Sequence, residues 1–317
     1  LHVRSRRQRQ MCIRDSTLTT SVAFIGLGNM GKRMSARLVD AGYKVAVFDV
    51  NAEAVADLVG RGATAASSPG EAAADADFIM TSLPSAKIIE AVYLGDDGVL
   101  STARNGAVAI DFSTVDPATA RKVNSRAAAA GVSFLDAPVS RGTAGAESGT
   151  LAIMVGGTPE AFKKAEPVLA NLGTSITLVG DSGAGAMVKL CNNMISAIIT
   201  AATAEVLVAG REVGLDTRTM QSVLSNSSAA SHMLTDYFPR VVFGETRPVG
   251  FTLDLMMKDI DLFLDAAGAG RTPLFVSSAV RQAYRLAQSQ GFGARDSCHI
   301  TELYEDAAQQ ELSLIHI

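Results

Sequence analysis

From residue 21 to about residue 180, short apolar runs alternate with amphipathic, helix-like stretches. The apolar runs have the composition of buried strands and read SVAFIG, KVAVFD, DFIMTS, AVAID, SFLDA, LAIMVG and SITLVG. Between them lie Ala-rich segments such as 30–41 and 116–130, and the second opens on Asp116-Pro117, a typical helix start. This alternation predicts βαβ units and therefore an α/β domain built on a doubly wound parallel sheet.

After about residue 182 the strand pattern stops and helical spacing takes over. We expect helices over 184–213, 216–225, 229–241, 252–268, 275–289 and 296–308. The first is about 30 residues long, or roughly 45 Å, which is enough to run from one domain into the next. The pattern thus predicts an all-α C-terminal domain joined to the sheet domain by a long connecting helix.

The domain boundaries follow from these patterns and from the two ends of the chain. We expect a nucleotide-binding domain over 19–181 and the helical domain over 182–310. Residues 1–18 contain five arginines without amphipathic spacing, and MCIRDS near the start and LSLIHI at the end resemble translated adapter sequence. We therefore expect a non-native or disordered leader at 1–18 and a non-native tail at 311–317.

Composition and charge favour a small-molecule enzyme. The chain is 48% hydrophobic and 19% charged, which is typical of a packed globular protein. Its net charge is −4, and −7 once the five arginines and two acidic residues of 1–16 and 311–317 are left out, so nucleic acid is not the expected partner. The longest apolar region, 193–210, is interrupted by Glu205, so no membrane segment is expected.

The cysteines bear on the compartment and on metal binding. Cys12, Cys191 and Cys298 are odd in number and far apart, so neither a disulfide framework nor a metal site is predicted. A reducing, cytoplasmic location suits them.

A glycine-rich stretch follows the first predicted strand and opens the first predicted helix. In VAFIGLGNMG (22–31), Gly26 permits a tight turn, Gly28 allows a pyrophosphate close to the backbone, and Gly31 allows close helix packing. This order of strand, glycine turn and helix predicts a Rossmann-type cofactor loop. Its residues are Gly26, Leu27, Gly28, Asn29, Met30 and Gly31.

Asp49 ends the second predicted strand, 21 positions after Gly28. A carboxylate there can accept hydrogen bonds from ribose hydroxyls and would repel a 2′-phosphate. Val50 and Asn51, which follow, supply no arginine for that phosphate, so the pattern favours NAD over NADP. The alternative is an exposed carboxylate at a strand end.

Polar residues form a stripe along the connecting helix. Lys189, Asn193, Ser196 and Thr200 recur at +4, +7 and +11, with Asn192 at the edge of the stripe. One lysine among short amides and hydroxyls is typical of a helix that lines a polar cavity, where the lysine could transfer a proton. A solvated face or simple packing would also give a stripe, and the residues alone do not decide between catalysis and packing.

With these residues in view, the chain resembles the β-hydroxyacid dehydrogenase family from about residue 21 to residue 308. Four ordered motifs carry the resemblance: GLGNMGKRM (26–34), DAPVSRGTAGAESGTL (136–151), KLCNN (189–193) and LMMKD (255–259). It implies a nicotinamide-dependent oxidoreductase that interconverts a small 3-hydroxy acid and its semialdehyde, in which Lys189 and Asn193 are catalytic. Further cofactor contacts are implied for Leu83, Pro84, Thr114 and Lys258, of which Thr114 could instead cap a helix and Lys258 could be a surface residue.

The second motif departs from the common pattern. Most similar chains read DAPVSGG, whereas Arg141 stands here between Ser140 and Gly142. An arginine adds a bidentate partner for an anion, and sulfolactaldehyde reductase looks similar in having it. The resemblance implies that a small anionic substrate is bound by Ser140, Arg141, Gly142, Asn192 and Ser196. Alternatively, Arg141 turns outward and pairs with Glu147 or solvent.

Other activities remain possible. A sulfonate substrate is one alternative, and an imine reductase or a non-catalytic nucleotide-binding protein is less favoured because such relatives generally lack the lysine. A dehydrogenase with a His–Asp pair is not supported, since His232 and His299 lie in the helical domain without a partnered motif. The resemblance also implies a homodimer or homotetramer.

Overall fold

The computed structural model describes residues 20–244 and 247–312. The expected leader and residues 313–317 of the expected tail lie outside these ranges. The chain forms two compact units, the first ending at Lys189 and the second beginning at Leu190. The division falls inside one long helix, so that helix belongs to both units.

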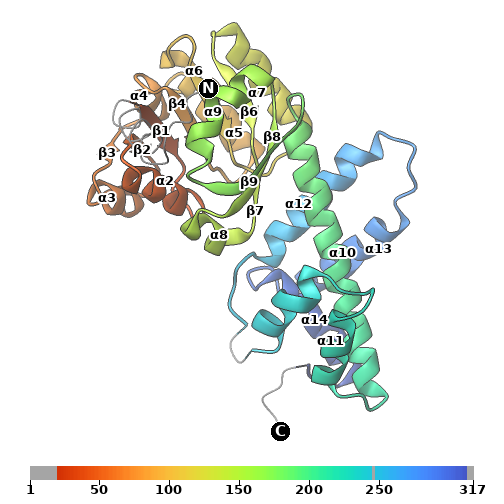
Figure 1. Ribbon diagram of the computed structural model, residues 1–317. Coiled ribbons are helices and arrows are strands. Elements are labelled where there is room, and N and C mark those ends of the chain that lie inside the picture. The colour runs from red at the N-terminus through yellow and green to blue at the C-terminus, as the bar shows by residue number, and fades with distance from the viewer. Residues whose placement is uncertain (1–19, 245–246, 313–317) are drawn as a thin grey trace, which may run out of the picture. The chain divides into compact units, whose positions relative to one another are not determined.

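The first unit is built on a mostly parallel sheet (Figure 1). Its described strands are β1 (Ser21–Ile25), β2 (Lys44–Phe48), β3 (Thr64–Ala65), β4 (Phe78–Thr81), β5 (Val108–Asp111), β6 (Ser133–Asp136), β7 (Val139–Ser140), β8 (Leu151–Gly156) and β9 (Gly173–Gly180). Their order is β3-β2-β1-β4-β5-β6-β8-β7, with β9 beside β8. All seven predicted strands are present, and β3 and β7, two residues each, are additional.

The sheet is parallel as predicted from β3 to β6, whereas β8 and its parallel neighbour β9 run in the opposite direction. β8 runs antiparallel to both β6 and β7. Only residues 141–150 connect β7 to β8, and a parallel crossover needs a dozen residues or more. The chain therefore returns beside β7 in the opposite direction.

Helices cover both faces of this sheet, as a doubly wound fold requires. One core contains Val22 and Phe24 of β1 with residues of α2 (Gly31–Asp40), α3 (Ala52–Val59) and α9 (Pro159–Leu169). The other contains Ala23 and Ile25 with α4 (Pro69–Ala73), α5 (Ala86–Leu94), α6 (Val99–Thr102) and α7 (Pro117–Ala129). Alternate residues of one strand thus enter opposite cores, because successive side chains of a strand point to opposite faces.

The second unit is helical. It contains most of α10 (Ala184–Glu212), then α11 (Thr217–Ser225), the π-helix η1 (Met233–Val242), α12 (Leu253–Gly268), α13 (Phe275–Ser289), the 3₁₀ turn η2 (Ser297–His299) and α14 (Ile300–Ala308). Buried residues of α10 contribute to two successive cores, the first with α12 and α13 and the second with η1. The predicted helices are present, with the 229–241 prediction realised as a π-helix that begins four residues later.

By length and apolar composition, α10 is the one described helix that could cross a membrane. One such helix is weak evidence, because the central helix of a globular core has the same properties. Met194, Ala197 and Ala201 of α10 pack in the core of the second unit.

Candidate active site

The first candidate site lies where the strand order reverses. β1 pairs with β2 on one side and with β4 on the other, and ligands of such sheets bind beyond the strand ends at this point. The loops after β1 and β4 are in contact there, since a Cβ atom on Gly26 would lie 2.4 Å from the carbonyl oxygen of Ser82. The glycine loop is therefore at the switch point.

The three glycines have distinct surroundings. Gly26 has a φ of +90°, which a side chain would strain. A Cβ on Gly31 would lie 1.9 Å from the Gly26 carbonyl oxygen, so the start of α2 packs directly on the turn. At Gly28, by contrast, a Cβ would meet no described atom within 4 Å. The loop is thus closed on its inner side and open at Gly28, where a pyrophosphate needs room.

The N-terminus of α2 lacks a side-chain cap. Met30 precedes the helix and makes no capping bond. In the same unit α6 and α8 (Gly142–Ser148) are also uncapped, whereas side chains cap α3, α4, α5, α7 and α9, through Asn51, Ser68, Ser85, Asp116 and Thr158. Uncapped N–H groups at a helix start can bind an anion, so α2 is suited to a cofactor phosphate.

Asp49 directly follows β2 and is fixed at the glycine loop. Its Oδ2 accepts a hydrogen bond from the Leu27 N–H at 2.5 Å, and its Oδ1 accepts one from the Asn51 N–H at 2.7 Å. A carboxylate has about four acceptor positions, so it can still accept from ribose hydroxyls. Leu27 itself is buried in the core, which leaves its backbone as the part that can face a ligand.

The other predicted cofactor residues of this unit lie on the loops after β4 and β5. Leu83 and Thr114 are half-buried, and Pro84 is exposed. The cap of α7 is Asp116, which accepts from the Thr119 N–H at 2.8 Å. Thr114 is therefore not the cap of this helix, the alternative role considered for it.

A buried carboxylate anchors the start of α10. Asp136, at the end of β6, accepts hydrogen bonds from the N–H groups of Gly183 at 2.7 Å and Ala186 at 2.9 Å. A Cβ on Gly185 would lie 2.4 Å from the Met154 carbonyl oxygen, so the helix sits directly on β8. Lys189 follows one turn later and is half-buried. The position of Lys189 in the first unit is thus set by β6 and β8.

In the second unit, the stripe residue Asn193 belongs to a buried polar cluster. Its Nδ2 donates to Asp259 Oδ2 at 2.5 Å, and Asn192 Nδ2 donates to Asn193 Oδ1 at 3.0 Å. Lys258 Nζ lies 3.0 Å from Asp259 Oδ1. Asp259 is only 1% exposed, and no role was predicted for it from the sequence although it closes the LMMKD motif. Lys258 is therefore not an isolated surface residue.

The polar stripe of α10 is not the solvated face of the helix. Asn193 and Thr200 are buried, and Lys189 and Ser196 are half-buried. Thr200 Oγ1 donates to the Ser196 carbonyl oxygen at 2.8 Å, so this hydroxyl is bonded to the backbone of its own helix. Lys189, Asn192, Asn193 and Ser196 are the stripe residues whose side chains could serve a ligand.

The Ser140–Gly142 segment has an unusual backbone. Arg141 has a φ of +83°, a conformation that costs a non-glycine residue about 1–2 kcal/mol. Its exposed guanidinium donates from Nη1 to the Thr150 carbonyl oxygen at 2.8 Å and to Thr174 Oγ1 at 3.3 Å. Glu147 is the alternative partner considered for Arg141, but its Oε2 instead lies 3.8 Å from Arg33 Nε.

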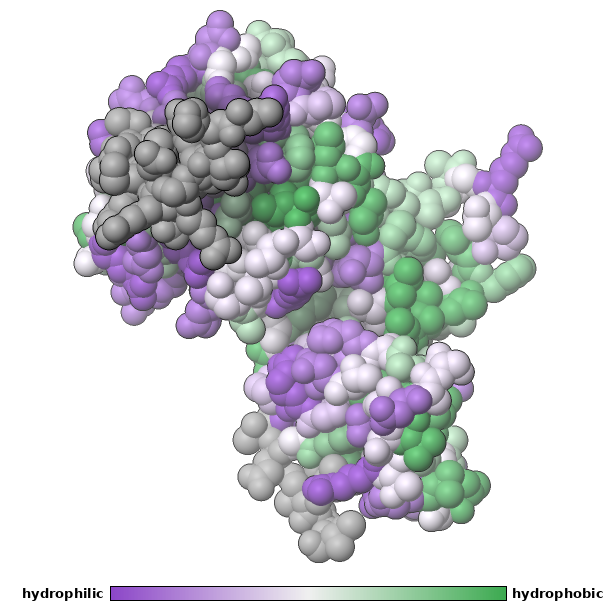
Figure 2. Space-filling model, viewed as in Figure 1, coloured by the Kyte–Doolittle hydropathy of each residue, from purple (hydrophilic) through white to green (hydrophobic). Residues whose placement is uncertain are grey.

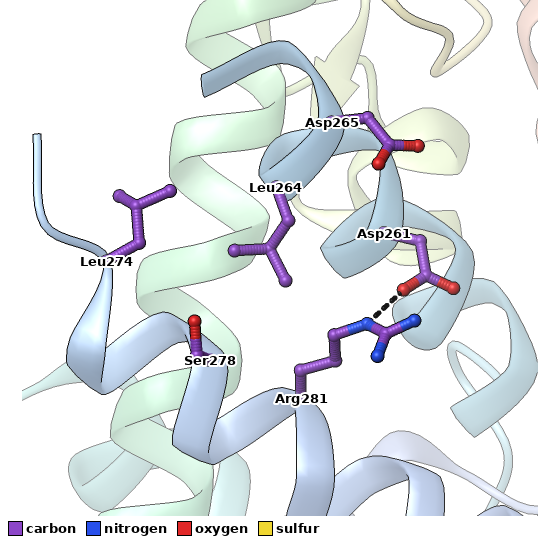
Figure 3. Close-up of a pocket in the computed structure, with 6 residues that line it drawn as sticks. All are labelled: Asp261, Leu264, Asp265, Leu274, Ser278 and Arg281. Carbon is purple, nitrogen blue, oxygen red and sulfur yellow. Dashed lines mark hydrogen bonds and ion pairs between the residues drawn. The ribbon is translucent and has the colours of Figure 1, made fainter. Parts of the chain in front are cut away.

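A cavity of about 520 Å³ lies in the second unit (Figure 3). It is lined by Asp261, Leu264, Asp265, Leu274, Ser278 and Arg281. Arg281 Nε donates to Asp261 Oδ1 at 2.6 Å across it. None of the predicted site residues lines this cavity, so the proposed chemistry does not lie there.

Two domain families match the chain. Residues 21–180 match the NAD binding domain of 6-phosphogluconate dehydrogenase. Residues 183–304 match the family described as NAD-binding of NADP-dependent 3-hydroxyisobutyrate dehydrogenase. The two matches correspond to the sheet and helical parts described above.

Curated relatives and solved structures agree with these families. A 3-hydroxyisobutyrate dehydrogenase of Pseudomonas aeruginosa is 44% identical over 80% of this chain and 88% of its own length. A 3-sulfolactaldehyde reductase of Escherichia coli is 38% identical over 89% of this chain and 95% of its own. The 3-hydroxyisobutyrate dehydrogenase of Mycobacterium tuberculosis, solved with L-serine, superimposes with a TM-score of 0.81 at 32% identity, covering 90% of this chain and 98% of that one.

Both matched families bind a nicotinamide dinucleotide, and the similar proteins are dehydrogenases and reductases. Gly28, the uncapped start of α2 and Asp49 have the properties that such a cofactor needs. The chain is therefore a nicotinamide-dependent oxidoreductase of small hydroxy acids and belongs to the β-hydroxyacid dehydrogenase family.

Proposed function

We propose that the protein interconverts a small 3-hydroxy acid and its semialdehyde with NAD, and that Lys189 moves the proton. The anchored start of α10 carries this proposal, because it holds a half-buried lysine at a set position, one turn after the contacts of the helix with β6 and β8. The similar proteins act, by their names, on 3-hydroxyisobutyrate and 3-sulfolactaldehyde, which are small and anionic.

The glycine loop and Asp49 would hold the dinucleotide, and a bound nicotinamide would supply hydride transfer to or from the reacting carbon. Lys189 donates a proton to the carbonyl oxygen during reduction and removes it from the hydroxyl during oxidation. Asn193 supports the lysine from one helical turn away. Because Asp259 accepts from Asn193 Nδ2, the amide presents Oδ1 as its acceptor for neighbouring donors such as an ammonium group.

NAD is the cofactor that Asp49 favours. Its two bonds to the N–H groups of Leu27 and Asn51 hold a negative charge at the edge of the glycine loop. A 2′-phosphate would meet that charge, and the residues that follow, Val50 and Asn51, offer no cation to offset it. Ribose hydroxyls would instead donate to the carboxylate.

The test is a Lys189→Ala variant assayed with NADH and a panel of succinic, methylmalonate and tartronate semialdehydes and sulfolactaldehyde. Loss of a positioned general acid is expected to lower kcat about 10²- to 10⁴-fold. The dissociation constant for NADH should stay within about twofold, since the glycine loop is unchanged.

Lys163→Glu is the control, because Lys163 is exposed on α9 away from the proposed site. It should turn over at the wild-type rate. Near-normal turnover of Lys189→Ala would refute the role of Lys189.

A sulfonate substrate is a second candidate, and the backbone of Arg141 favours it. A residue that keeps a φ of +83° at a cost in stability is a candidate for a functional side chain. Arginine binds tetrahedral and planar anions through several N–H groups. We infer that Arg141 exchanges its present bonds to Thr150 and Thr174 for the substrate anion.

An Arg141→Gly variant tests this candidate. Glycine adopts a positive φ without strain, so the variant is expected to be as stable as wild type or more stable, by about 1 kcal/mol in urea denaturation. Its kcat/KM for sulfolactaldehyde should fall about tenfold or more relative to that for carboxylate semialdehydes. An unchanged ratio between the two substrate types would exclude Arg141 from anion selection.

A further inference from the structure

A chain of buried hydrogen bonds links the ends of β4 and β5. Thr81 Oγ1 donates to Asp111 Oδ1 at 2.7 Å, and Ser113 Oγ donates to the same oxygen at 2.6 Å. The Leu83 N–H in turn donates to Ser113 Oγ at 2.8 Å. Thr81, Asp111 and Ser113 are all buried. One carboxylate oxygen therefore connects two neighbouring loops at the edge of the sheet.

Keeping the Asp111 carboxylate buried and charged lowers the stability of the folded protein. Asp111 is 2% exposed, its hydrogen-bond partners are the hydroxyl groups of Thr81 and Ser113 and the Ser113 N–H, and no described ion pair neutralises it. Burial raises the pKa of Asp111 to about 6, and the nearby carboxylate of Asp136 acts in the same direction. Burying a charge without a cation costs stability, which packing alone gives no reason to accept.

The loops that it connects are those at the cofactor site. Leu83 lies on the loop after β4, and the Leu83 Cδ2 atom would be 2.9 Å from a Cβ on Gly26. Ser113 immediately precedes Thr114 on the loop after β5. The Ser82 N–H also donates to the Ile25 carbonyl oxygen at 3.0 Å, which ties the same loop to the end of β1. A change in the position of Ser113 would therefore also shift Leu83 and the glycine loop.

We propose that Asp111 and Ser113 are positioning residues for the dinucleotide, which hold the loops after β4 and β5 in their cofactor-binding shape through the Ser113–Leu83 hydrogen bond. Ser113 is buried and acts through the Leu83 backbone, not by touching the cofactor. A loop that is already ordered loses less conformational entropy when the ligand binds, so the gain appears as affinity. The proposal rests on dinucleotide binding by this unit and does not depend on the substrate or on Lys189.

The same network supplies a matched control at its far end. Tyr93 on α5 is fully buried, and its hydroxyl group pairs with Thr81 Oγ1 at 3.0 Å. Tyr93→Phe removes a buried hydroxyl, as Ser113→Ala does, but leaves the bond between Ser113 and Leu83 in place. The two variants therefore separate loop positioning from general stability.

The experiment measures NADH affinity by fluorescence titration, without substrate, and NADH kinetics with the best semialdehyde. For Ser113→Ala, the loss of the hydrogen bonds to the Leu83 N–H and to Asp111 is expected to raise the dissociation constant and the KM for NADH about five- to tenfold. Its kcat should stay within about twofold, and its Tm should fall at least as much as that of Tyr93→Phe, because the Ser113 hydroxyl also donates to a charged carboxylate. For Tyr93→Phe, the Tm should fall while NADH affinity stays within about twofold.

A second pair of variants tests Asp111 itself. Asp111→Asn keeps an oxygen that can accept from Thr81 and Ser113, so it is expected to bind NADH within about twofold of wild type. Asp111→Ala removes the acceptor and should bind about as weakly as Ser113→Ala, or more weakly.

Wild-type NADH affinity in Ser113→Ala would overturn the proposal, as would an equal loss of affinity in Tyr93→Phe. If Asp111→Ala does not fold, the comparison of Ser113→Ala with Tyr93→Phe is sufficient. Since the binding assay contains no substrate, loss of turnover in Lys189→Ala and loss of affinity here are distinguishable results.

Discussion

Individual carboxylates fix the main parts of the candidate site: the glycine loop, the start of α10 and the side chain of Asn193. Asp49 joins the glycine loop to the end of β2, Asp136 anchors α10, and Asp259 orients Asn193. Each accepts from backbone or amide N–H groups, which are bonds to a charged acceptor and so stronger than neutral ones. At the residue scale, the chain uses buried or half-buried charge to fix geometry.

Asp111 gives this pattern a measurable pH dependence. Burial raises its pKa from 3.8 to about 6 in the folded protein, so the folded state binds this proton more tightly than the unfolded state. Asp111 therefore favours folding at low pH, and that contribution is lost as the pH rises from about 4 to about 6. Asp111→Asn has no carboxyl group at this position, so it should not lose stability in this way as the pH rises. It is expected to be more stable than wild type at pH 7.5 by about 1–3 kcal/mol.

Urea denaturation at pH 5 and pH 7.5 measures this effect. The advantage of Asp111→Asn over wild type should be larger at pH 7.5 than at pH 5. Asp306→Asn is the control, because Asp306 is exposed on α14 and should show no such change. A constant difference between Asp111→Asn and wild type at the two pH values would contradict the assignment.

At the scale of elements, the contact of α10 with β6 determines where Lys189 lies. Asp136 and the glycines at 156 and 185 let the helix start directly on the sheet, because a Cβ on Gly185 would lie 2.5 Å from the Asp136 carbonyl oxygen. The helix is continuous from Ala184 to Glu212, so a shift at its start moves the lysine by a similar distance.

Gly185→Ala is the corresponding prediction. The added methyl group should push the start of α10 away from β6 and β8, and a displacement of about 1 Å can lower turnover about 10²-fold. We expect kcat to fall about 10- to 100-fold, while the dissociation constant for NADH stays within about twofold. The measurement is steady-state kinetics beside NADH titration.

Gly268→Ala is its matched control, since Gly268 is a helical glycine of α12 with no described atom within 4 Å of an added Cβ. This substitution should leave kcat unchanged and be neutral or slightly stabilising. Wild-type kcat in Gly185→Ala would show that the helix start does not position Lys189.

Local patterns predicted the elements well, because strands and helices are encoded by the spacing of residues that become buried. The contacts that build the site were not predictable in this way. Asp136 is separated from Gly183 by 47 residues, and Asn193 from Asp259 by 66, so no local spacing joins them. Arg141 was singled out from the sequence, but its positive φ was not, because that conformation belongs to the turn from β7 into α8, which no residue pattern marks.

At the scale of the whole molecule, the helical unit carries several large apolar side chains that are more than half exposed. Ile195 and Val206 of α10 are 57% and 56% exposed, and Phe275 and Val276 at the start of α13 are 81% and 60% exposed. Figure 2 shows hydrophobic residues gathered on the face of this unit that carries α10 and α13. Large exposed apolar patches mark interaction surfaces.

We predict that this face joins copies of the chain into a homodimer or homotetramer. Stable interfaces bury about 800 Å² on each partner and tolerate unpaired charges poorly at their centre. The double variant Ile195→Glu, Val206→Glu places two like charges, 11 residues apart, on the exposed side of α10. Light scattering after size exclusion should then give the monomer mass, whereas wild type and Lys163→Glu should keep the larger one. If the double variant keeps the wild-type mass, another surface holds the copies together, and the apolar side of α10 needs a different occupant.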